Sequence, residues 1–417
     1  MTTDRLLDLD FVRSQVPAFS DPDTARWAHL ENAGGSYAAG PVVDLIASLF
    51  VTAKVQPSWD FGPSKAATAA MQRAREVMAA TFNAGPDEIH FGPSTSQNTF
   101  VLAQAMRPMW AEGDEIVVTE QDHEANSGVW RRLAATGITV RDWKVDPVTG
   151  LLDPADLDEL IGDRTRLVAM THASNVAATI NPVADVARRV HAVGGHLVVD
   201  GVSFAPHGGV DVAALECDVY LYSAYKTYGP HVGMMYVRGA LLPQLAHQGH
   251  FFNESHLDTR LTPAGPDHAM IGATAGIVDY YDLLHAHHFP DASGSTSAVE
   301  RIREMSGIFA AHESSLMAPL VDLLTGRDGV RLIGSQSADA TVRAPTLAFT
   351  SERRSSASIY DALIAAEVSC GHGHFYAHRL VTALGLDLDD GVVRVSMVHY
   401  NTPEEVARAL EVLEPLI

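Results

Sequence analysis

The chain of 417 residues has few cysteines, few basic residues and no long apolar run, and each shortage excludes a class of protein. Two cysteines cannot form the disulfide framework of a small secreted domain, and they suit a reducing compartment. The formal charge of −22 repels nucleic-acid phosphates and anionic membranes. No apolar run reaches the roughly 18 residues of a membrane span, and the first residues carry no signal-peptide pattern. We therefore expect a cytoplasmic globular protein with neither a nucleic-acid nor a membrane partner.

What the sequence does contain is an alternation of short apolar runs with amphipathic segments. The runs are rich in Val, Ile and Tyr and mostly continuous, which is typical of strands buried on both faces of a parallel sheet. Helical patterns at 64–83, at 96–110 and after Pro182 lie between them. The alternation predicts βαβ units and a doubly wound α/β sheet. The expected strands cover residues 88–91, 115–120, 138–145, 166–171, 196–200, 218–223 and 233–238.

The pattern changes near residue 290. There HAHHFPDASGSTSA joins a His-rich piece to a Pro/Gly/Ser break, and a long helical pattern follows at 296–324. We predict a large domain over residues 26–290 and a smaller C-terminal domain over 291–417. We expect the N-terminal segment, residues 1–25, to pack on the small domain.

Two charged residues stand at the ends of predicted strands, 26 positions apart. Asp200 ends HLVVD, and Lys226 follows DVYLYS in a Ser-Ala-Tyr-Lys turn. In an open α/β sheet, ligands bind at the carboxyl ends of strands. A lysine amine there can condense with the aldehyde of pyridoxal phosphate, and a carboxylate can keep its pyridine nitrogen protonated. Taken alone, the two residues fit a buried ion pair or two unrelated charges as well as they fit a cofactor site.

Three further strand ends carry polar residues that suit the same cofactor. FGPSTSQNTF runs from a strand into a helix N-terminus, which suits a phosphate or ordinary capping by Ser94 or Thr95. His123 can stack on a planar cofactor and relay a proton, or be a plain loop histidine. Asn175 can donate to the cofactor's phenolic oxygen, or shape a turn. Their succession at strand ends favours a single cofactor site.

With these residues in place, the chain resembles fold-type-I pyridoxal-phosphate enzymes, and most closely the class V aminotransferase and cysteine desulfurase family. The resemblance runs from HLENAGG, at about Leu30, to the C-terminus. It implies a mostly parallel seven-stranded sheet in a large domain, a smaller α+β C-terminal domain and a homodimer. The pieces that carry it are DGVSFAPHGGVDVAALECDVYLYSAYKTYGP, SNVAATINPV and RVSMVHYNTPEEVARAL.

The resemblance also implies a role for each matching residue. Lys226 holds the cofactor and shuttles a proton, Asp200 pairs with the pyridine nitrogen, and His123 stacks on the ring. An arginine suits bidentate binding of the substrate α-carboxylate, and Arg394 takes that role. Further cofactor contacts are implied for Thr95, Ser96 and Ser223 at the phosphate, for Asn175 near the phenolic oxygen, and for Gly265 at the phosphate site of the partner subunit.

The chain departs from the desulfurase pattern at three positions. Ser203 stands where desulfurases have Gln, and Tyr225 where they have the His before the lysine; its hydroxyl can still reach a phosphate. In GHFYA, Tyr376 stands where one desulfurase group keeps the cysteine that accepts sulfur. We therefore expect the subgroup without that cysteine, in which His374 and Tyr376 shape the substrate pocket. The predicted activity is a lyase acting at Cβ of an amino acid without persulfide chemistry, and the alternative is a class V aminotransferase.

Two rival hypotheses come from other classes of protein. A metal-dependent hydrolase would use Cys370, His372, His374 and His378, whose residue types suit a metal. The glycines between them give a flexible loop and no carboxylate joins the cluster, so we predict no metal. A catalytically silent binding protein on the same fold would have no need of Lys226.

Overall fold

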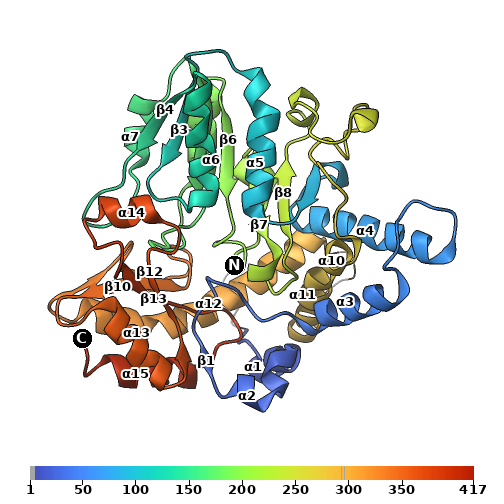
Figure 1. Ribbon diagram of the computed structural model, residues 1–417. Coiled ribbons are helices and arrows are strands. Elements are labelled where there is room, and N and C mark those ends of the chain that lie inside the picture. The colour runs from blue at the N-terminus through green and yellow to red at the C-terminus, as the bar shows by residue number, and fades with distance from the viewer. Residues whose placement is uncertain (1–4, 293, 295) are drawn as a thin grey trace.

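A seven-stranded sheet is the largest element of the computed structural model, which describes residues 5–292, 294 and 296–417 (Figure 1). Its strands are β2 (Ile89–Gly92), β3 (Glu115–Thr119), β4 (Thr139–Trp143), β5 (Thr165–Thr171), β6 (His196–Asp200), β7 (Val219–Ser223) and β8 (Gly233–Val237). They lie in the order β2-β8-β7-β6-β5-β3-β4. β8 is antiparallel to β2 and β7, and the other neighbouring pairs are parallel. The seven expected strands and the mostly parallel sheet are confirmed.

Both faces of this sheet are buried because its strands carry apolar side chains on both sides. In β3, Val117 packs into one hydrophobic cluster and its neighbour Val118 into another. β6 repeats the pattern with Val199 and Val198. Successive side chains of a strand point to opposite faces, so one apolar run supplies two layers of core.

Helices cover the two faces. They are α3 (Gly40–Thr52), α4 (Gly62–Thr81), α5 (Thr95–Met106), α6 (Gly128–Arg132), α7 (Pro154–Leu160), α8 (Val183–Ala192), α9 (Val212–Leu215), α10 (His268–Ala273) and α11 (Ala275–His288). α5 and α6 contribute Leu102 and Trp130 to one cluster. α4 and α8 contribute Met78 and Val186 to the other. None of the helices in the described part of the chain is long and apolar enough to cross a membrane.

A four-stranded antiparallel sheet organises the C-terminal part. Its strands are β9 (Val330–Leu332), β10 (Thr346–Ser351), β12 (Gly371–Gly373) and β13 (Val392–Ser396), in the order β12-β13-β10-β9. Four helices accompany it: α12 (Ala298–Thr325), α13 (Ser356–Ala365), α14 (His378–Ala383) and α15 (Pro403–Leu413). Phe349 of β10, Leu363 of α13 and Ala409 of α15 belong to one separate hydrophobic cluster. This part therefore has a core of its own.

The long helix α12 contributes to both cores. Its first half places Met305 and Phe309 in a cluster of the large sheet, and its second half places Leu316 and Leu320 in the cluster of the small one. The boundary at residue 290 stays a prediction, and the helix that follows it belongs to both parts.

The N-terminal segment contacts both parts of the molecule. It contains α1 (Leu9–Ser14) and α2 (Pro22–Ala25), and residues 1–4 of the predicted segment lie outside the described residues. Val12 packs into a cluster of the large sheet, while Arg13 pairs with Glu405 of α15 at 2.9 Å. Directly after the segment, β1 (Ala28–His29) runs parallel to β11 (Val368–Ser369). This pairing ties the start of the chain to the C-terminal part.

Candidate active site

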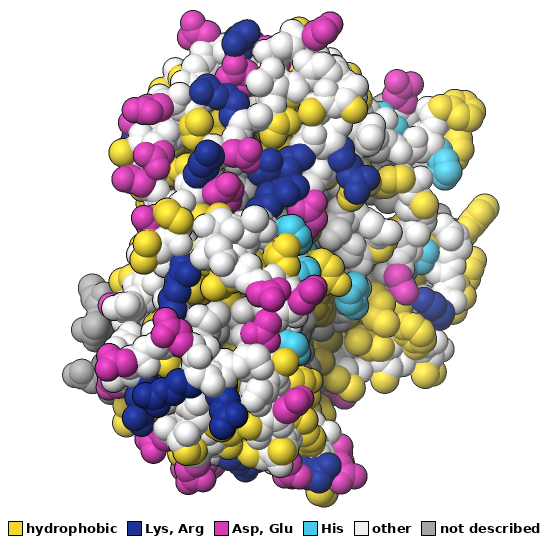
Figure 2. Space-filling view, turned by 60° about the vertical axis from the view of Figure 1, so that its left-hand side comes forward, with side chains coloured by type: hydrophobic (Ala, Val, Ile, Leu, Met, Phe, Trp, Pro, Cys, Tyr) yellow, Lys and Arg dark blue, Asp and Glu magenta, His cyan; other side chains and the backbone are white. Residues whose placement is uncertain are grey.

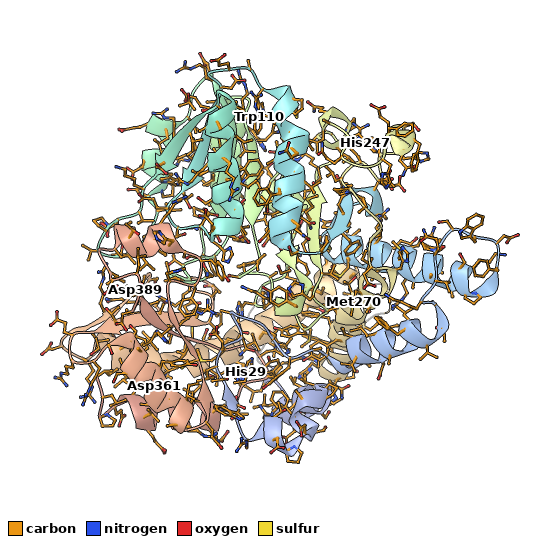
Figure 3. The ribbon with its side chains drawn as sticks, in the orientation of Figure 1. His29, Trp110, His247, Met270, Asp361 and Asp389 are labelled. Atoms are coloured by element: carbon orange, nitrogen blue, oxygen red, sulfur yellow. The ribbon has the colours of Figure 1, made fainter. Side chains whose placement is uncertain are left out.

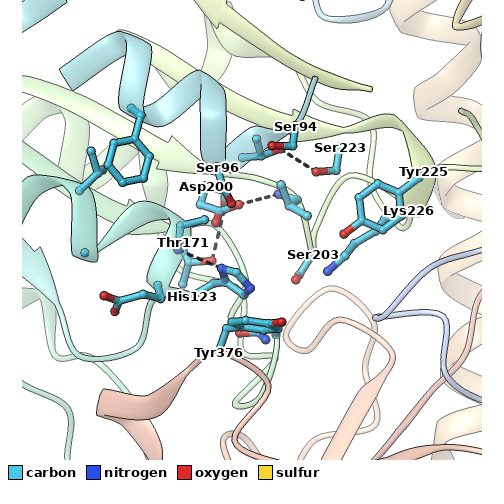
Figure 4. A pocket seen from close by; sticks show the side chains of 18 of the residues that line it. Ser94, Ser96, His123, Thr171, Asp200, Ser203, Ser223, Tyr225, Lys226 and Tyr376 are labelled. Carbon is cyan, nitrogen blue, oxygen red and sulfur yellow. Dashed lines mark hydrogen bonds between the residues drawn. The ribbon is translucent and has the colours of Figure 1, made fainter. Parts of the chain in front are cut away.

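A cavity of about 440 Å³ opens where β5, β6 and β7 end (Figure 4). The last residues of these strands, Thr171, Asp200 and Ser223, all line it. It is therefore at the sheet edge where the sequence predicts a ligand. The predicted site residues that line it are Thr95, Ser96, His123, Asn175, Asp200, Ser203, Ser223, Tyr225, Lys226 and Tyr376.

Lys226 is the one buried lysine among the four in the chain. It is 8% exposed, whereas Lys54, Lys65 and Lys144 are exposed at the surface. A short 3-10 turn, Ala224–Lys226, follows β7 directly and places the lysine at the cavity. A buried amine that forms no ion pair with any described residue suggests a reactive group rather than a structural one.

The surroundings of Lys226 favour its neutral form. Burial and then the charge of Arg394 lower its pKa from 10.5 to about 8, while Asp200 and Glu31 act in the opposite direction. Only the neutral amine is nucleophilic, so a lysine with this pKa is reactive near neutral pH.

Asp200 ends β6, next to Thr171 of β5 in the sheet. Its Oδ1 accepts a hydrogen bond from the backbone N–H of Val202 at 3.0 Å. Burial raises its pKa, and the Val202 hydrogen bond and the charge of Lys226 oppose that rise. A buried carboxyl group of this kind is stabilised by a cationic partner, and a protonated pyridine nitrogen is one.

The N-terminus of α5 forms another wall of the cavity. Ser94 caps this helix by accepting a hydrogen bond from the N–H of Gln97 at 3.2 Å, so the capping alternative holds for Ser94. Thr95 Oγ1 lies 2.6 Å from Ser223 Oγ, and Ser96 lines the cavity beside them. Hydroxyls grouped at a helix N-terminus suit an anion such as a phosphate.

His123 is partly buried and neutral. Its Nδ1 accepts a hydrogen bond from the N–H of Ala125 at 3.0 Å, which assigns the ring proton to Nε2. Burial, then the charges of Lys226 and Arg394, lower its pKa to about 4. Its ring centroid lies 5.1 Å from that of Tyr376. A neutral flat ring at the cavity wall suits the predicted stacking on a cofactor.

A loop from the C-terminal part closes over this wall. Asn175 Nδ2 donates to the carbonyl of Phe375 at 2.8 Å, and the N–H of Glu124 donates to that of Tyr376 at 2.9 Å. Phe375 and Tyr376 both have left-handed backbones, with φ of 49° and 60°. The Oδ1 of Asn175 is buried and has no hydrogen-bond partner in the part of the chain that the structure describes. Strained backbone and an unpaired polar atom at one cavity suggest a binding role.

Two other predicted residues, Ser203 and Tyr225, also line the cavity. Tyr225 stacks on His231 with ring centroids 4.7 Å apart, so its ring has a fixed orientation. Ser203 lines the cavity on the loop that follows Asp200.

Three predicted residues lie outside the cavity lining. Gly265 lines a neighbouring hollow that shares Phe100 and His231 with the cavity. His374 Nδ1 accepts from the N–H of Tyr376 at 3.1 Å and so braces the loop. Arg394, on β13, is 3% exposed and lies behind the lining residue Asn175, to whose carbonyl it donates at 3.2 Å.

The structure adds residues that the sequence did not indicate. Phe100, Arg132 and His231 line the cavity, and Glu31 pairs with Arg394. Glu31 stands in HLENAGG, where the resemblance begins, but 363 positions separate it from its partner. No local pattern predicts a contact over that distance.

The cysteines and the His-rich loop give no support to a metal-dependent hydrolase. Cys217 and Cys370 are buried, neither lines the cavity, and burial raises the pKa of each thiol to about 12. Across residues 5–292, 294 and 296–417, no group of three His, Cys, Asp or Glu side chains is placed to hold a metal. The ligand set proposed for Cys370, His372, His374 and His378 is therefore not assembled.

The groups at the cavity fit pyridoxal phosphate. A buried amine, a buried carboxyl group and a hydroxyl-bearing helix N-terminus match its aldehyde, its ring nitrogen and its phosphate. A neutral imidazole completes the wall.

Comparison with known proteins agrees with this geometry. Residues 28–409 match the family described as aminotransferase class V. An aminotransferase-like protein of Gibberella zeae is 36% identical over 98% of both chains, and a cysteine desulfurase-like protein of Aspergillus flavus is 30% identical over 99% of this chain and 92% of its own. The apo structure of a cysteine desulfurase from Thermococcus onnurineus superposes with a TM-score of 0.83 at 23% identity, covering 100% of this chain and 99% of that one. The fold is therefore that of fold-type-I enzymes, and the chain belongs to the class V aminotransferase and cysteine desulfurase-like family of pyridoxal-phosphate enzymes.

Proposed function

We propose that this enzyme is a lyase that cleaves a bond at Cβ of an amino acid without persulfide chemistry. The observation that carries the proposal is the cavity itself, which joins Lys226 and Asp200 but has a tyrosine, Tyr376, in its wall and no cysteine. Bound there, pyridoxal phosphate supplies an electron sink for negative charge at the substrate Cα.

The chain's own residues bind and orient the cofactor and the substrate. Asp200 would hold the proton on the ring nitrogen of the bound cofactor, and His123 would pack against its ring. Asn175 and Ser203 lie on the side proposed for the phenolic oxygen. Lys226, whose pKa of about 8 leaves part of the amine neutral, takes and returns the Cα proton. The proposed phosphate contacts come from Thr95, Ser96, Ser223 and the Tyr225 hydroxyl.

Sulfur relay needs a thiolate that can reach the substrate. Cys370 stands six positions before Tyr376, is buried, and has a pKa of about 12. A thiol of that kind is almost entirely protonated at neutral pH and is a poor sulfur acceptor. His374 and Tyr376 take the corresponding place, where we propose that they shape the pocket for the substrate side chain.

The alternative is a transaminase, which the description of the Gibberella relative as aminotransferase-like favours. A screen of amino acids separates the two. A lyase acting on a cysteine-type substrate releases pyruvate and ammonia without a second substrate. A transaminase turns over only when a keto acid is added, and that dependence would contradict the lyase.

We further propose a homodimer that completes the cofactor site. Large apolar side chains are exposed, among them Phe251 and Val51, both 86% exposed. Phe251 directly follows His250, which lines a second hollow that also holds Gly265. Figure 2 shows hydrophobic side chains gathered on its right-hand side, the side of α3 and α4 in Figure 1. Exposed apolar patches of this kind mark protein interfaces. Gly265 would then face the phosphate site of the partner subunit. A cytoplasmic location stays a prediction.

A further inference from the structure

Glu31 and Arg394 form an ion pair beside the cavity, at the junction of the two parts of the molecule. Figure 3 labels His29, which stands two positions before Glu31, at this junction. Arg394 Nη2 donates to Glu31 Oε1. Resting on the role that the resemblance implies for Arg394 as the ligand of the substrate carboxylate, we propose that Glu31 pairs with this arginine in place of that carboxylate, so that substrate binding exchanges one carboxylate for another.

The arginine is fixed in position. Its guanidinium lies 3.8 Å over the ring of Phe375, and its Nη1 donates to the carbonyl of Asn175. At 3% exposure it has little room to move. Asn175 and the residue after Phe375 both line the cavity, so the arginine lies directly behind that wall.

The ion pair is incomplete on both sides. Arg394 Nε and Glu31 Oε2 are both buried, and neither has a hydrogen-bond partner among the described residues. A carboxylate matched to an arginine makes two parallel hydrogen bonds, and Glu31 makes one. Unpaired buried donors and acceptors are costly, so the pair leaves a site that a better-placed carboxylate would satisfy.

Glu31 has the freedom that the arginine lacks. Its side chain is 25% exposed, and it begins a turn that continues into Gly34. A Cβ at Gly34 would come within 2.6 Å of Glu31 Oε1, and one at Gly371 within 3.3 Å. These glycines leave the space in which the carboxylate sits. With a quarter of its side chain exposed, Glu31 has a route to solvent that Arg394 lacks.

The exchange predicts that Glu31 weakens the binding of carboxylates. Replacing it with the isosteric amide, Glu31→Gln, keeps the shape of the turn and removes the competing charge. We expect the dissociation constant of propionate, measured by calorimetry on the cofactor-loaded protein, to fall about tenfold. Glu31→Asp retains the charge on a shorter side chain. We expect its dissociation constant for propionate to lie between those of the wild type and Glu31→Gln.

Two controls isolate the effect. Propionamide has no charge to exchange, so Glu31→Gln should leave its weak binding unchanged. Glu367→Gln removes the carboxylate of a surface pair with Arg26 and should leave propionate binding unchanged.

The outcomes are distinguishable. Unchanged or weaker propionate binding in Glu31→Gln would overturn the exchange and make Glu31 a residue that positions Arg394. If neither wild type nor Glu31→Gln binds propionate while both keep the absorption of the cofactor, Arg394 is not the carboxylate site, and the proposed role falls together with the exchange.

Discussion

The lowered pKa of Lys226 gives a pH dependence that can be measured on the cofactor-free protein. Below pH 8 most of this amine is an ammonium ion, which cannot attack the cofactor aldehyde, and above it the amine is neutral. The rate of cofactor uptake should therefore rise with pH and level off above a midpoint near 8. Stopped-flow absorbance would show this. A rate that keeps rising towards pH 10.5 would mean that Lys226 has the pKa of an ordinary exposed lysine.

Asp200 gives a second prediction for a single residue. Asp200→Asn keeps the shape of the side chain but cannot stabilise a proton on the ring nitrogen. We expect kcat to fall about a hundredfold or more, with little change in melting temperature. The control is Asp87→Asn, at an exposed position that does not line the cavity. Nearly full activity in Asp200→Asn would contradict the proposed pairing.

The loop after β12 is the element whose conformation bears most directly on the pocket. It begins after Gly373, the last residue of β12, which has a φ of 117°, and it contains the left-handed Phe375 and Tyr376. Gly373→Ala meets no atom within 4 Å but forces a side chain into that backbone conformation. We expect a loss of about 1–3 kcal/mol in the free energy of unfolding, measured by denaturant titration, and reduced activity.

A matched control exists in the same chain. Gly162 also has open space around its would-be Cβ, but its φ is not left-handed. Gly162→Ala should therefore be neutral or slightly stabilising. Equal losses in the two variants would show that the loop backbone is not the cause.

The strands of the large sheet were predictable because each apolar run is local and continuous. Both boundaries of 196–200 agree with β6. The start of α5 was also predictable, since a Gly-Pro turn and a hydroxyl cluster mark it. The loop over the cavity was not, because Phe375 is held by Asn175, 200 positions away. Local patterns carry no information on such a contact.

At the scale of the whole molecule, the proposed homodimer predicts a concentration-independent mass near twice 44.7 kDa by light scattering. Exchanging the exposed Phe251 and Phe252 together for Ser should weaken the dimer and, through Gly265, the affinity for the cofactor. The control is Val148→Ser, an exposed apolar position in another region of the chain. A monomer that binds the cofactor tightly would contradict the shared site.

The sequence predicted most of the cavity because its residues stand at strand ends, and parallel strands bring their carboxyl ends to one edge. It did not predict what lies behind that edge. Arg394 was identified as a carboxylate ligand by resemblance alone, and the structure shows it already paired with Glu31. This pairing depends on how the stretch after β1 meets the small sheet, where Glu31 forms a bridge with Ser396, a contact that only the folded chain defines.

The most direct test is to find where the cofactor is attached. Borohydride reduction of the purified protein, followed by proteolysis and mass spectrometry, should place one pyridoxyl group on Lys226 and none on Lys54, Lys65 or Lys144. The absorption band of the linked cofactor should be lost in Lys226→Ala. A label on another lysine, or a colourless protein that takes up no added pyridoxal phosphate, would contradict the account.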